Sequence, residues 1–272
     1  MNCISTLDIQ YEDASILVCI KPAGLPVQTA KTGRKDLVSE LKNYRTRKGE
    51  DPYIGLIHRL DQPVRGIMLF AKTKKAAAHL SRQVSSRQIG KEYMAVVCGL
   101  PDTSAESITE NDDRMLSAAA AAPGAAANAD RLKHILPQTG ELHDYLLRDG
   151  RTNTSRVVPK DTPGAKEALL SYEVVKQNAE TGKSLVHITL RTGRHHQIRV
   201  QFAHAGFPLY ADAKYGQPLP AGNYCPIALC SYKISFIHPD TGREMTFEMK
   251  DTESDISSCS VSLLSVESNS DT

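Results

Sequence analysis

The sequence predicts an α+β fold with a mixed, largely antiparallel central sheet and flanking helices. Two observations favour this class: segments typical of strands outnumber those typical of helices, and the two kinds do not alternate strictly along the chain. The composition agrees with a folded chain, because 40% of the 272 residues are hydrophobic and 24% are charged. A chain that is disordered throughout is therefore excluded.

Seven segments have the patterns of β-strands. The first three are apolar runs typical of buried strands, and the next two alternate apolar and polar residues. A turn containing Pro22 and Gly24 ends the first strand, and residues 239–242 join the last two strands into a hairpin. The predicted strands cover residues 15–20, 66–71, 93–98, 168–175, 184–190, 232–237 and 245–249.

Three segments predict helices. Asp36 is a favourable N-cap for the first, whose apolar residues at positions 37, 41 and 44 share one face. The second has apolar residues at positions 77, 80 and 84 and a basic outer face. The third covers about residues 195–205, and Gly206 is expected to end it.

Two further segments lack these patterns. An Ala-rich, low-complexity stretch at about 103–138 predicts an insertion or mobile loop within one domain that covers residues 1–250. Residues 251–272 are rich in Ser and acidic residues and contain no Lys or Arg, so we expect a disordered tail.

Several classes of protein are disfavoured. No apolar run approaches the ~20 residues that a bilayer-spanning helix needs, and the N-terminus lacks a secretory signal. The six cysteines are scattered without a CxxC pair, which argues against a zinc ribbon and against a disulfide framework. We therefore expect a protein of the cytoplasm that does not associate with membranes.

The charge is unevenly distributed. Removing the five acidic residues of the tail raises the net charge from +2 for the whole chain to +7 for residues 1–250. Within this body, residues 72–91 contain six basic and no acidic residues, and residues 31–48 contain seven basic and two acidic residues. Any one cluster is explained by a solvated helix face. Several clusters around one candidate site favour a polyanionic partner such as RNA.

The densest polar cluster precedes the second predicted strand. His58, Arg59, Asp61 and Arg65 there interrupt apolar sequence, where charged groups cost free energy unless they are paired. An isolated Asp is more often a turn or cap residue, but two arginines and a Gly lie within five positions of Asp61. The cluster marks Asp61 as either salt-bridged or functional.

A second cluster opens the third predicted helix. Arg194, His195, His196 and Arg199 directly follow a strand, and a helix N-terminus attracts phosphate or carboxylate groups. A metal site is disfavoured because His196 and His204 are eight positions apart and no acidic residue lies nearby in the sequence.

Lys91 and Tyr93 form a third candidate, at the head of the third predicted strand. A lone Tyr in this position is more often part of the core. Its ring could alternatively present a face on which a base stacks.

Together, these residues resemble the RluA-type RNA pseudouridine synthases. Four segments match in the expected order: residues 13–27, 55–73 with the His58 to Asp61 motif intact, 91–99 and 191–216. One short motif has little specificity, but four collinear motifs are strong and cover most of residues 13–250. Unlike many relatives, the chain has Val64 and Arg65 before Gly66, and we expect it to lack their small N-terminal RNA-binding domain.

The resemblance implies the family's catalytic fold, with an active-site cleft across the sheet, and the isomerisation of uridine to pseudouridine. Because no atoms are gained or lost, no cofactor or metal is expected. By motif, Asp61 is the catalytic carboxylate and Arg199 is its partner. Tyr93 would stack on the detached uracil, and its oxygen could accept the C5 proton. Whether Asp61 attacks C1′ or removes the 2′ proton stays open.

The resemblance and the charge clusters also predict contacts with RNA. Arg59 and Arg194 would grip the phosphates that flank the target. Arg65, Lys72 and Lys91 would extend this grip. His58 is assigned to structure, or at most to contact with displaced RNA.

The expected partner is ribosomal or transfer RNA, bound by a monomer. A catalytically silent RNA-binding relative is one alternative, although such a module has no need of a buried carboxylate that repels phosphate. A nucleoside N-glycosidase is another, but no second acid lies near Asp61 to activate water. Free uracil as a product would favour the glycosidase, and product retained in the polymer would favour the isomerase.

Overall fold

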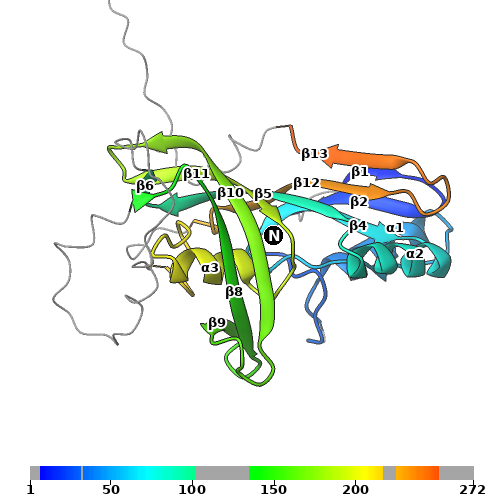
Figure 1. Ribbon diagram of the computed structural model, residues 1–272. Helices are drawn as coiled ribbons and strands as arrows, with labels where there is room; N and C mark the ends of the chain where they lie inside the picture. Colours follow the sequence, from blue (N-terminus) through cyan, green and yellow to red (C-terminus); the bar gives the residue numbers. More distant parts are fainter. Residues whose placement is uncertain (1–6, 32, 102–134, 217–224, 251–272) are drawn as a thin grey trace, which may run out of the picture.

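The computed structural model describes residues 7–31, 33–101, 135–216 and 225–250 (Figure 1). Most of the predicted Ala-rich insertion, and all of the predicted tail at 251–272, lie outside these residues. The described chain forms an 11-stranded sheet, a separate two-stranded sheet and three short helices. This is the predicted α+β class.

The large sheet is mixed, as predicted. The strands are β1 Asp8–Glu12, β2 Ile16–Lys21, β3 Gly55–Leu56, β4 Arg65–Ala71, β5 Gly90–Cys98, β6 Leu100–Pro101, β7 Ile135–Leu136, β8 Thr139–Asp149, β9 Thr154–Val158, β10 Lys166–Asn178, β11 Lys183–Leu190, β12 Leu229–Ile237 and β13 Glu244–Glu248. The main path runs β1-β2-β4-β12-β5-β11-β10-β8-β9, with β3 beside β4 and β13 beside β12. Among the described strands of this sheet, only β4 and β12 pair in parallel.

Side-chain caps begin the first two helices. Asp36 Oδ1 accepts a hydrogen bond from Ser39 N at 2.8 Å, and Thr73 Oγ1 accepts one from Ala76 N at 3.1 Å. None of the described helices is both long and apolar enough to cross a membrane. The helices are α1 Leu37–Arg47, α2 Lys74–Ser85 and α3 Gln197–His204.

The sheet is covered on both faces, and the alternation along β5 shows which side chains belong to which face. Tyr93, Ala95 and Val97 join the core on one face, where α1 and α3 also contribute apolar residues. Met94 and Val96 join the core on the other face, with α2. Tyr93 therefore shares its face with α3 in the centre of the sheet.

The third helix begins two residues later than predicted. His196 has φ 55° and ψ 25°, in the left-handed region, which a right-handed helix cannot include. The predicted end is confirmed: Gly206 has φ +90°, and Phe207 N donates to Phe202 O at 2.9 Å. The helix thus starts at Gln197, and the preceding histidine belongs to the loop.

The sequence patterns missed β1, β3, β6, β7, β8 and β9. Strands β8 and β9 form a hairpin that extends away from the rest of the sheet (Figure 1). Only Leu146 is buried among the 11 residues of β8, so this strand has too few apolar residues for a period-two signal. Its backbone pairing with β10 holds it in the sheet.

Gly66 brings the chain after Asp61 close to the centre of the sheet. Its φ is +147°, and a Cβ at this position would lie 2.4 Å from the carbonyl oxygen of Ser231. Ser231 is in turn opposite Tyr93 in the pairing of β12 with β5. The loop between β3 and β4 therefore ends beside β12, and Tyr93 lies on the next strand, β5.

Candidate active site

A pocket of about 100 Å³ lies at the centre of the sheet, and a groove of about 1110 Å³ adjoins it and shares several of its lining residues. The loop between β3 and β4, the head of β5 and the start of α3 line the pocket. Asp61, Arg59 and Arg194 line both cavities. The structure therefore brings together residues from three of the sequence clusters.

Asp61 is paired with Arg199, as expected from the motifs. Arg199 Nη1 lies 3.0 Å from Asp61 Oδ2, and the Arg199 side chain is 6% exposed while that of Asp61 is 25% exposed. The other side of the guanidinium binds Asp212, through Nε at 2.8 Å and Nη2 at 2.7 Å. One arginine thus bridges a half-buried carboxylate that lines the pocket and a fully buried one.

The Asp212 contact fixes Arg199 in place. Burial alone would raise the pKa of Asp212, but Arg199 and the backbone N–H groups of Lys214 and Tyr215 hold it below its usual range. Burial also opposes the charge of Arg199, yet the hydrogen bonds of Asp212 and Asp61 raise the pKa of Arg199. Both groups remain ionised, so the guanidinium is a permanent cation beside Asp61.

His196 approaches Asp61 from the start of α3. Its Nε2 lies 3.5 Å from Asp61 Oδ2, and its Nδ1 lies 2.7 Å from the hydroxyl of Tyr215. Burial lowers the pKa of His196 to about 4, even though Asp61 attracts the charged form. The ring is therefore neutral near neutral pH. Sequence reasoning placed His196 in the polar cluster that opens the third predicted helix and in a disfavoured metal site, but it gave His196 no contact with Asp61.

Tyr93 lines the pocket and is 6% exposed. Burial raises the pKa of its phenol, partly offset by a hydrogen bond with Ser231, so the ring is neutral. A buried, uncharged ring is suited to stacking against a base. A neutral phenol oxygen is also a weak base.

His58 has a structural contact, in line with the assignment from the sequence. Its Nε2 accepts a hydrogen bond from Leu69 N in β4 at 3.0 Å. Burial, with a smaller contribution from Lys91, lowers the pKa of His58 to about 3. Its Nδ1 is buried without a hydrogen-bond partner among the described residues.

Lys91 lies inside the narrow pocket, where burial lowers the pKa of its ammonium. It adjoins the start of α3, because a Cβ on Gly193 would lie 3.1 Å from Lys91 Nζ. Arg194 donates through Nε to Glu167 O at 2.7 Å, and Arg59 is exposed at the rim. These three residues are therefore positioned at the cavity, as the sequence suggested.

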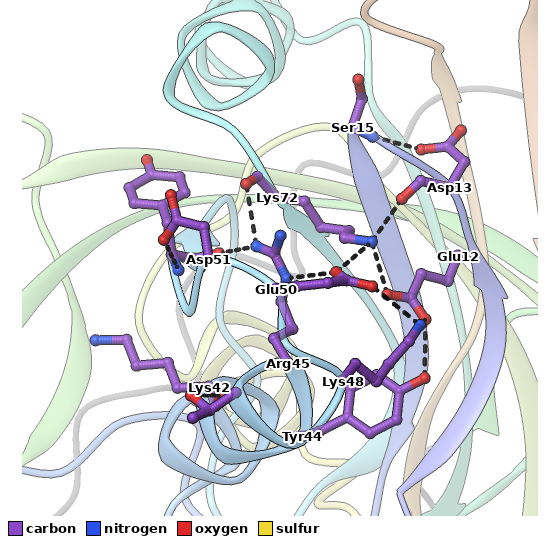
Figure 2. Close-up of polar contacts among 12 residues, drawn as sticks. Glu12, Asp13, Ser15, Lys42, Tyr44, Arg45, Lys48, Glu50, Asp51 and Lys72 are labelled. Atoms are coloured by element: carbon purple, nitrogen blue, oxygen red, sulfur yellow. Dashed lines mark hydrogen bonds and ion pairs between the residues drawn. The ribbon is translucent and has the colours of Figure 1, made fainter.

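Lys72 is a correction. The sequence placed it on a basic surface for RNA, but it is 7% exposed and its Nζ lies 2.7 Å from Glu12 Oε1 and 3.1 Å from Glu50 Oε2 (Figure 2). It lines neither of the two cavities described above. Burial with two carboxylates removes it from the candidate RNA contacts.

Arg65 lies at the start of β4, and it too is absent from the lining of both cavities. Arg65 pairs with Cys230 of β12 in the sheet. The sequence suggested a phosphate contact for Arg65 because Val64 and Arg65 stand before Gly66 where many relatives have other residues.

Lys21 was missed by sequence reasoning, although it lies in the first matching motif. It is fully buried, and its ammonium donates to the carbonyl oxygens of Pro22 at 2.9 Å, Leu25 at 2.8 Å and Gln62 at 3.0 Å. Burial lowers its pKa to about 8, although the charge of Asp61 opposes this. It fastens the turn after β2 to the residue next to Asp61.

A metal-binding site requires a group of side chains that could bind the ion. Among the residues that the structure describes, no three His, Cys, Asp or Glu side chains gather closely enough to hold a metal ion.

Sequence comparison agrees with this geometry. Residues 15–204 match the family described as RNA pseudouridylate synthase. The chain belongs to this family. The match contains every residue of the pocket except Leu229, from His58 to Arg199.

Curated relatives include ribosomal large subunit pseudouridine synthase D of Neisseria meningitidis serogroup B, which is 31% identical over 89% of this chain and 57% of that protein. An uncharacterised RNA pseudouridine synthase of Bacillus subtilis is 30% identical over 86% of this chain and 65% of that protein. The chain thus spans 57% to 65% of the length of these two relatives.

Solved structures share the fold. The human protein called RNA pseudouridylate synthase domain containing 1 is 19% identical, with a TM-score of 0.66 over 95% of this chain and 89% of that one. Human RNA pseudouridylate synthase domain containing 4 is 21% identical, with a TM-score of 0.62 over 89% and 88%.

Proposed function

We propose that this chain isomerises uridine to pseudouridine in RNA, with Asp61 as the catalytic carboxylate. The observation that carries the proposal is the pairing of Asp61 with Arg199 at 3.0 Å in a pocket that Tyr93 also lines. A guanidinium in contact with a carboxylate favours the ionised form, which both proposed roles of Asp61 require. Membership of the pseudouridylate synthase family supports the same reaction.

The reaction rearranges bonds without an added reagent. The C1′–N1 bond of the uridine breaks, the uracil turns, and C1′ bonds to C5. The C5 hydrogen leaves as a proton and N1 gains one, so atoms and electrons balance. Asp61 starts this sequence in one of two ways. It attacks C1′ to form an ester that breaks when C5 bonds to C1′, or it removes the 2′ proton and returns it to C2′ when that bond forms. Tyr93 stacks on the detached base and keeps it in the pocket while it turns.

The wider groove is proposed to hold the RNA strand around an everted uridine, since a stacked base cannot reach the pocket. Its lining supplies four cationic side chains besides Arg199 and has two acidic ones, Asp61 and Asp212, that are both paired with Arg199. A groove of this charge attracts phosphates. The four residues are Arg59, Arg148, Arg194 and Lys214.

For the substrate, we propose ribosomal RNA, because the Neisseria relative carries a large-subunit name. Transfer RNA stays the alternative, and the cytoplasm and a monomeric state stay predictions. The test incubates the purified chain with large-subunit ribosomal RNA and, separately, with transfer RNA, and maps pseudouridine in each. Pseudouridine at a defined position, absent with Asp61→Asn, would support the proposal.

Other products would replace the proposal. Released uracil with an abasic site left in the RNA would identify an N-glycosidase. Binding of either RNA without any conversion, by a chain shown to be folded, would identify a silent RNA-binding protein.

A further inference from the structure

Both contacts to the Asp61 carboxylate fall on the same oxygen. Arg199 Nη1 lies 3.0 Å and His196 Nε2 lies 3.5 Å from Oδ2. Within the described part of the chain, Oδ1 makes no hydrogen bond or ion pair. The carboxylate thus has one held oxygen and one that is uncommitted in a pocket-lining residue.

The contacts of His196 with Tyr215 and Asp61 together indicate which nitrogen of its ring carries the proton. Ser155 N donates to the Tyr215 hydroxyl oxygen at 2.8 Å, and a backbone N–H can only donate. The hydroxyl proton of Tyr215 is then free to point at His196 Nδ1, 2.7 Å away. A neutral ring that accepts at Nδ1 carries its proton on Nε2, which is the nitrogen that faces Asp61.

The surroundings keep this ring neutral. His196 is 7% exposed, and desolvation is the largest influence on its pKa. The opposite tautomer would direct a ring lone pair at the carboxylate oxygen, which is repulsive. The charged or titratable groups that face the ring are Asp61, Arg199, His195, Lys214 and Tyr215.

The backbone of His196 is held in an unusual conformation to make these contacts. Left-handed backbone is uncommon for residues other than Gly and costs free energy that the surrounding structure must supply. The His195 ring stacks on that of His196 with 3.8 Å between centroids, and Ser155 and Asn153 of the hairpin bind His195. The hairpin between β8 and β9 therefore supports the ring from outside.

We propose that His196 directs the N–H of Nε2 at Oδ2 of Asp61 as a second donor beside Arg199, that Tyr215 sets its tautomer, and that Oδ1 is the oxygen that reacts with the uridine. The inference rests on the proposed function, since it assigns a role at the same carboxylate. It makes His196 a positioning residue that acts through Asp61, because its contact is with Oδ2 and not with the reacting oxygen. Tyr215 is a positioning residue that acts through His196.

The kinetic test compares two replacements of His196 under single-turnover conditions. His196→Phe keeps a ring and removes both nitrogens, whereas His196→Gln restores an N–H donor near the position of Nε2. We expect the Phe variant to lower the rate of pseudouridine formation about 10- to 100-fold, the effect of losing one hydrogen bond to a charged group. The Gln variant should recover at least half of this loss on a logarithmic scale, while RNA affinity stays within about threefold in both.

A double-mutant cycle tests the link to Tyr215. Tyr215→Phe alone should slow the reaction, but it should have no further effect in the His196→Phe background, because its influence passes through that ring. Tyr145→Phe on β8 is the matched control, since no described residue hydrogen-bonds to its hydroxyl, and it should leave the rate unchanged. Additive losses from the two variants would overturn the proposed link.

A second measurement needs no substrate, so it separates this inference from the proposed function. Long-range ¹H–¹⁵N spectra of the full chain, with the His196 signals assigned by their loss in His196→Gln, should show a protonated Nε2 and a bare Nδ1. A protonated Nδ1 would overturn the inference whether or not the chain is active, and whether or not His196→Phe folds. Conversion at the wild-type rate by a folded His196→Phe would overturn it as well. A wild-type chain that converts no RNA would overturn the proposed function, while these spectra still decide the tautomer.

Discussion

The molecule contains two clusters of paired charges, which differ in how their carboxylate oxygens are paired. The site network consists of Asp61, Arg199 and Asp212. The second, which we call the support network, joins β1, the end of α1 and the residue after β4 (Figure 2). It consists of Glu12, Arg45, Lys48, Glu50 and Lys72.

Exposure does not distinguish the two networks. The side chain of Glu50 is 30% exposed and that of Asp61 is 25% exposed. What differs is how the oxygens are used. Glu50 binds Lys48 through Oε1 and Lys72 through Oε2, at 3.2 Å and 3.1 Å, whereas Arg199 and the neutral His196 ring both contact Asp61 at Oδ2.

This difference separates a structural carboxylate from a reactive one. When both oxygens of a carboxylate have partners within the protein, the contacts stabilise the fold, and neither oxygen is available to a substrate. A carboxylate held by one oxygen beside a pocket is oriented and still able to react. The support network contains more ion pairs than the site network, so a count of ion pairs does not identify the reactive carboxylate.

Replacing one carboxylate in each network should affect different properties, the reaction rate in the site network and the stability in the support network. This is the largest contrast we expect. Asp61→Asn removes the reacting charge and should lower pseudouridine formation at least about a thousandfold, with RNA affinity within about tenfold. Glu50→Gln should lower stability and leave the single-turnover rate of the folded chain unchanged. Rates from pseudouridine mapping and free energies from urea unfolding measure both. An active Asp61→Asn variant would contradict the assignment.

The shared guanidinium of the site network should also be irreplaceable. Arg199→Lys keeps the charge, but an ammonium cannot donate to both oxygens of Asp212 while it also binds Asp61. We expect the rate to fall about a hundredfold, with a lower melting temperature. Arg82→Lys, at an exposed position on α2, is the matched control and should change neither.

Lys72 tests the correction to the sequence-based assignment. Lys72→Met leaves Glu12 and Glu50 with fewer partners and should lower the free energy of unfolding by about 2–3 kcal/mol, less than for an isolated buried pair because Lys48 and Arg45 remain. RNA affinity, measured by filter binding, should stay unchanged. Lys74→Met, two positions on and exposed, should leave stability unchanged. Weaker RNA binding by Lys72→Met with normal stability would restore the surface role.

The sequence predicted those parts of the site that depend on local pattern. Asp61, Tyr93 and Arg199 lie in motifs that are recognisable in the chain itself, and the structure places them in one pocket. The sequence could not predict that Lys72 is buried and paired, because its partners Glu12 and Glu50 lie 60 and 22 positions away. A count of basic residues in one segment treats a buried lysine like an exposed one.

The role of His196 was also out of reach of sequence pattern. A regular helix beginning at His195 would give His196 a helical backbone, whereas the observed left-handed conformation directs its ring toward Asp61. Tyr215 and Asp212 were part of a recognised motif without an assigned role. Only the folded chain shows that they contact His196 and Arg199.

His58 supplies the smallest expected effect, and it concerns stability rather than activity. Its pKa of about 3 in the folded chain lies below the value of about 6.5 for an unfolded histidine, so the unfolded state binds the proton first as pH falls. Its contribution to stability is present above pH 6.5 and is lost progressively below that value. Between pH 6.5 and 5 the loss should be about 1.6 kcal/mol, in a window where few carboxylates titrate.

His58→Gln should flatten this slope, because a Gln carbonyl oxygen can still accept the hydrogen bond from Leu69 N but does not titrate. His143→Gln is the matched control, since the side chain of His143 is 53% exposed, and it should keep the wild-type slope. Urea unfolding at a series of pH values measures both. Equal slopes in the wild type and His58→Gln would mean that the His58 ring takes up its proton in the folded chain, and that its contact with β4 does not depend on a neutral ring.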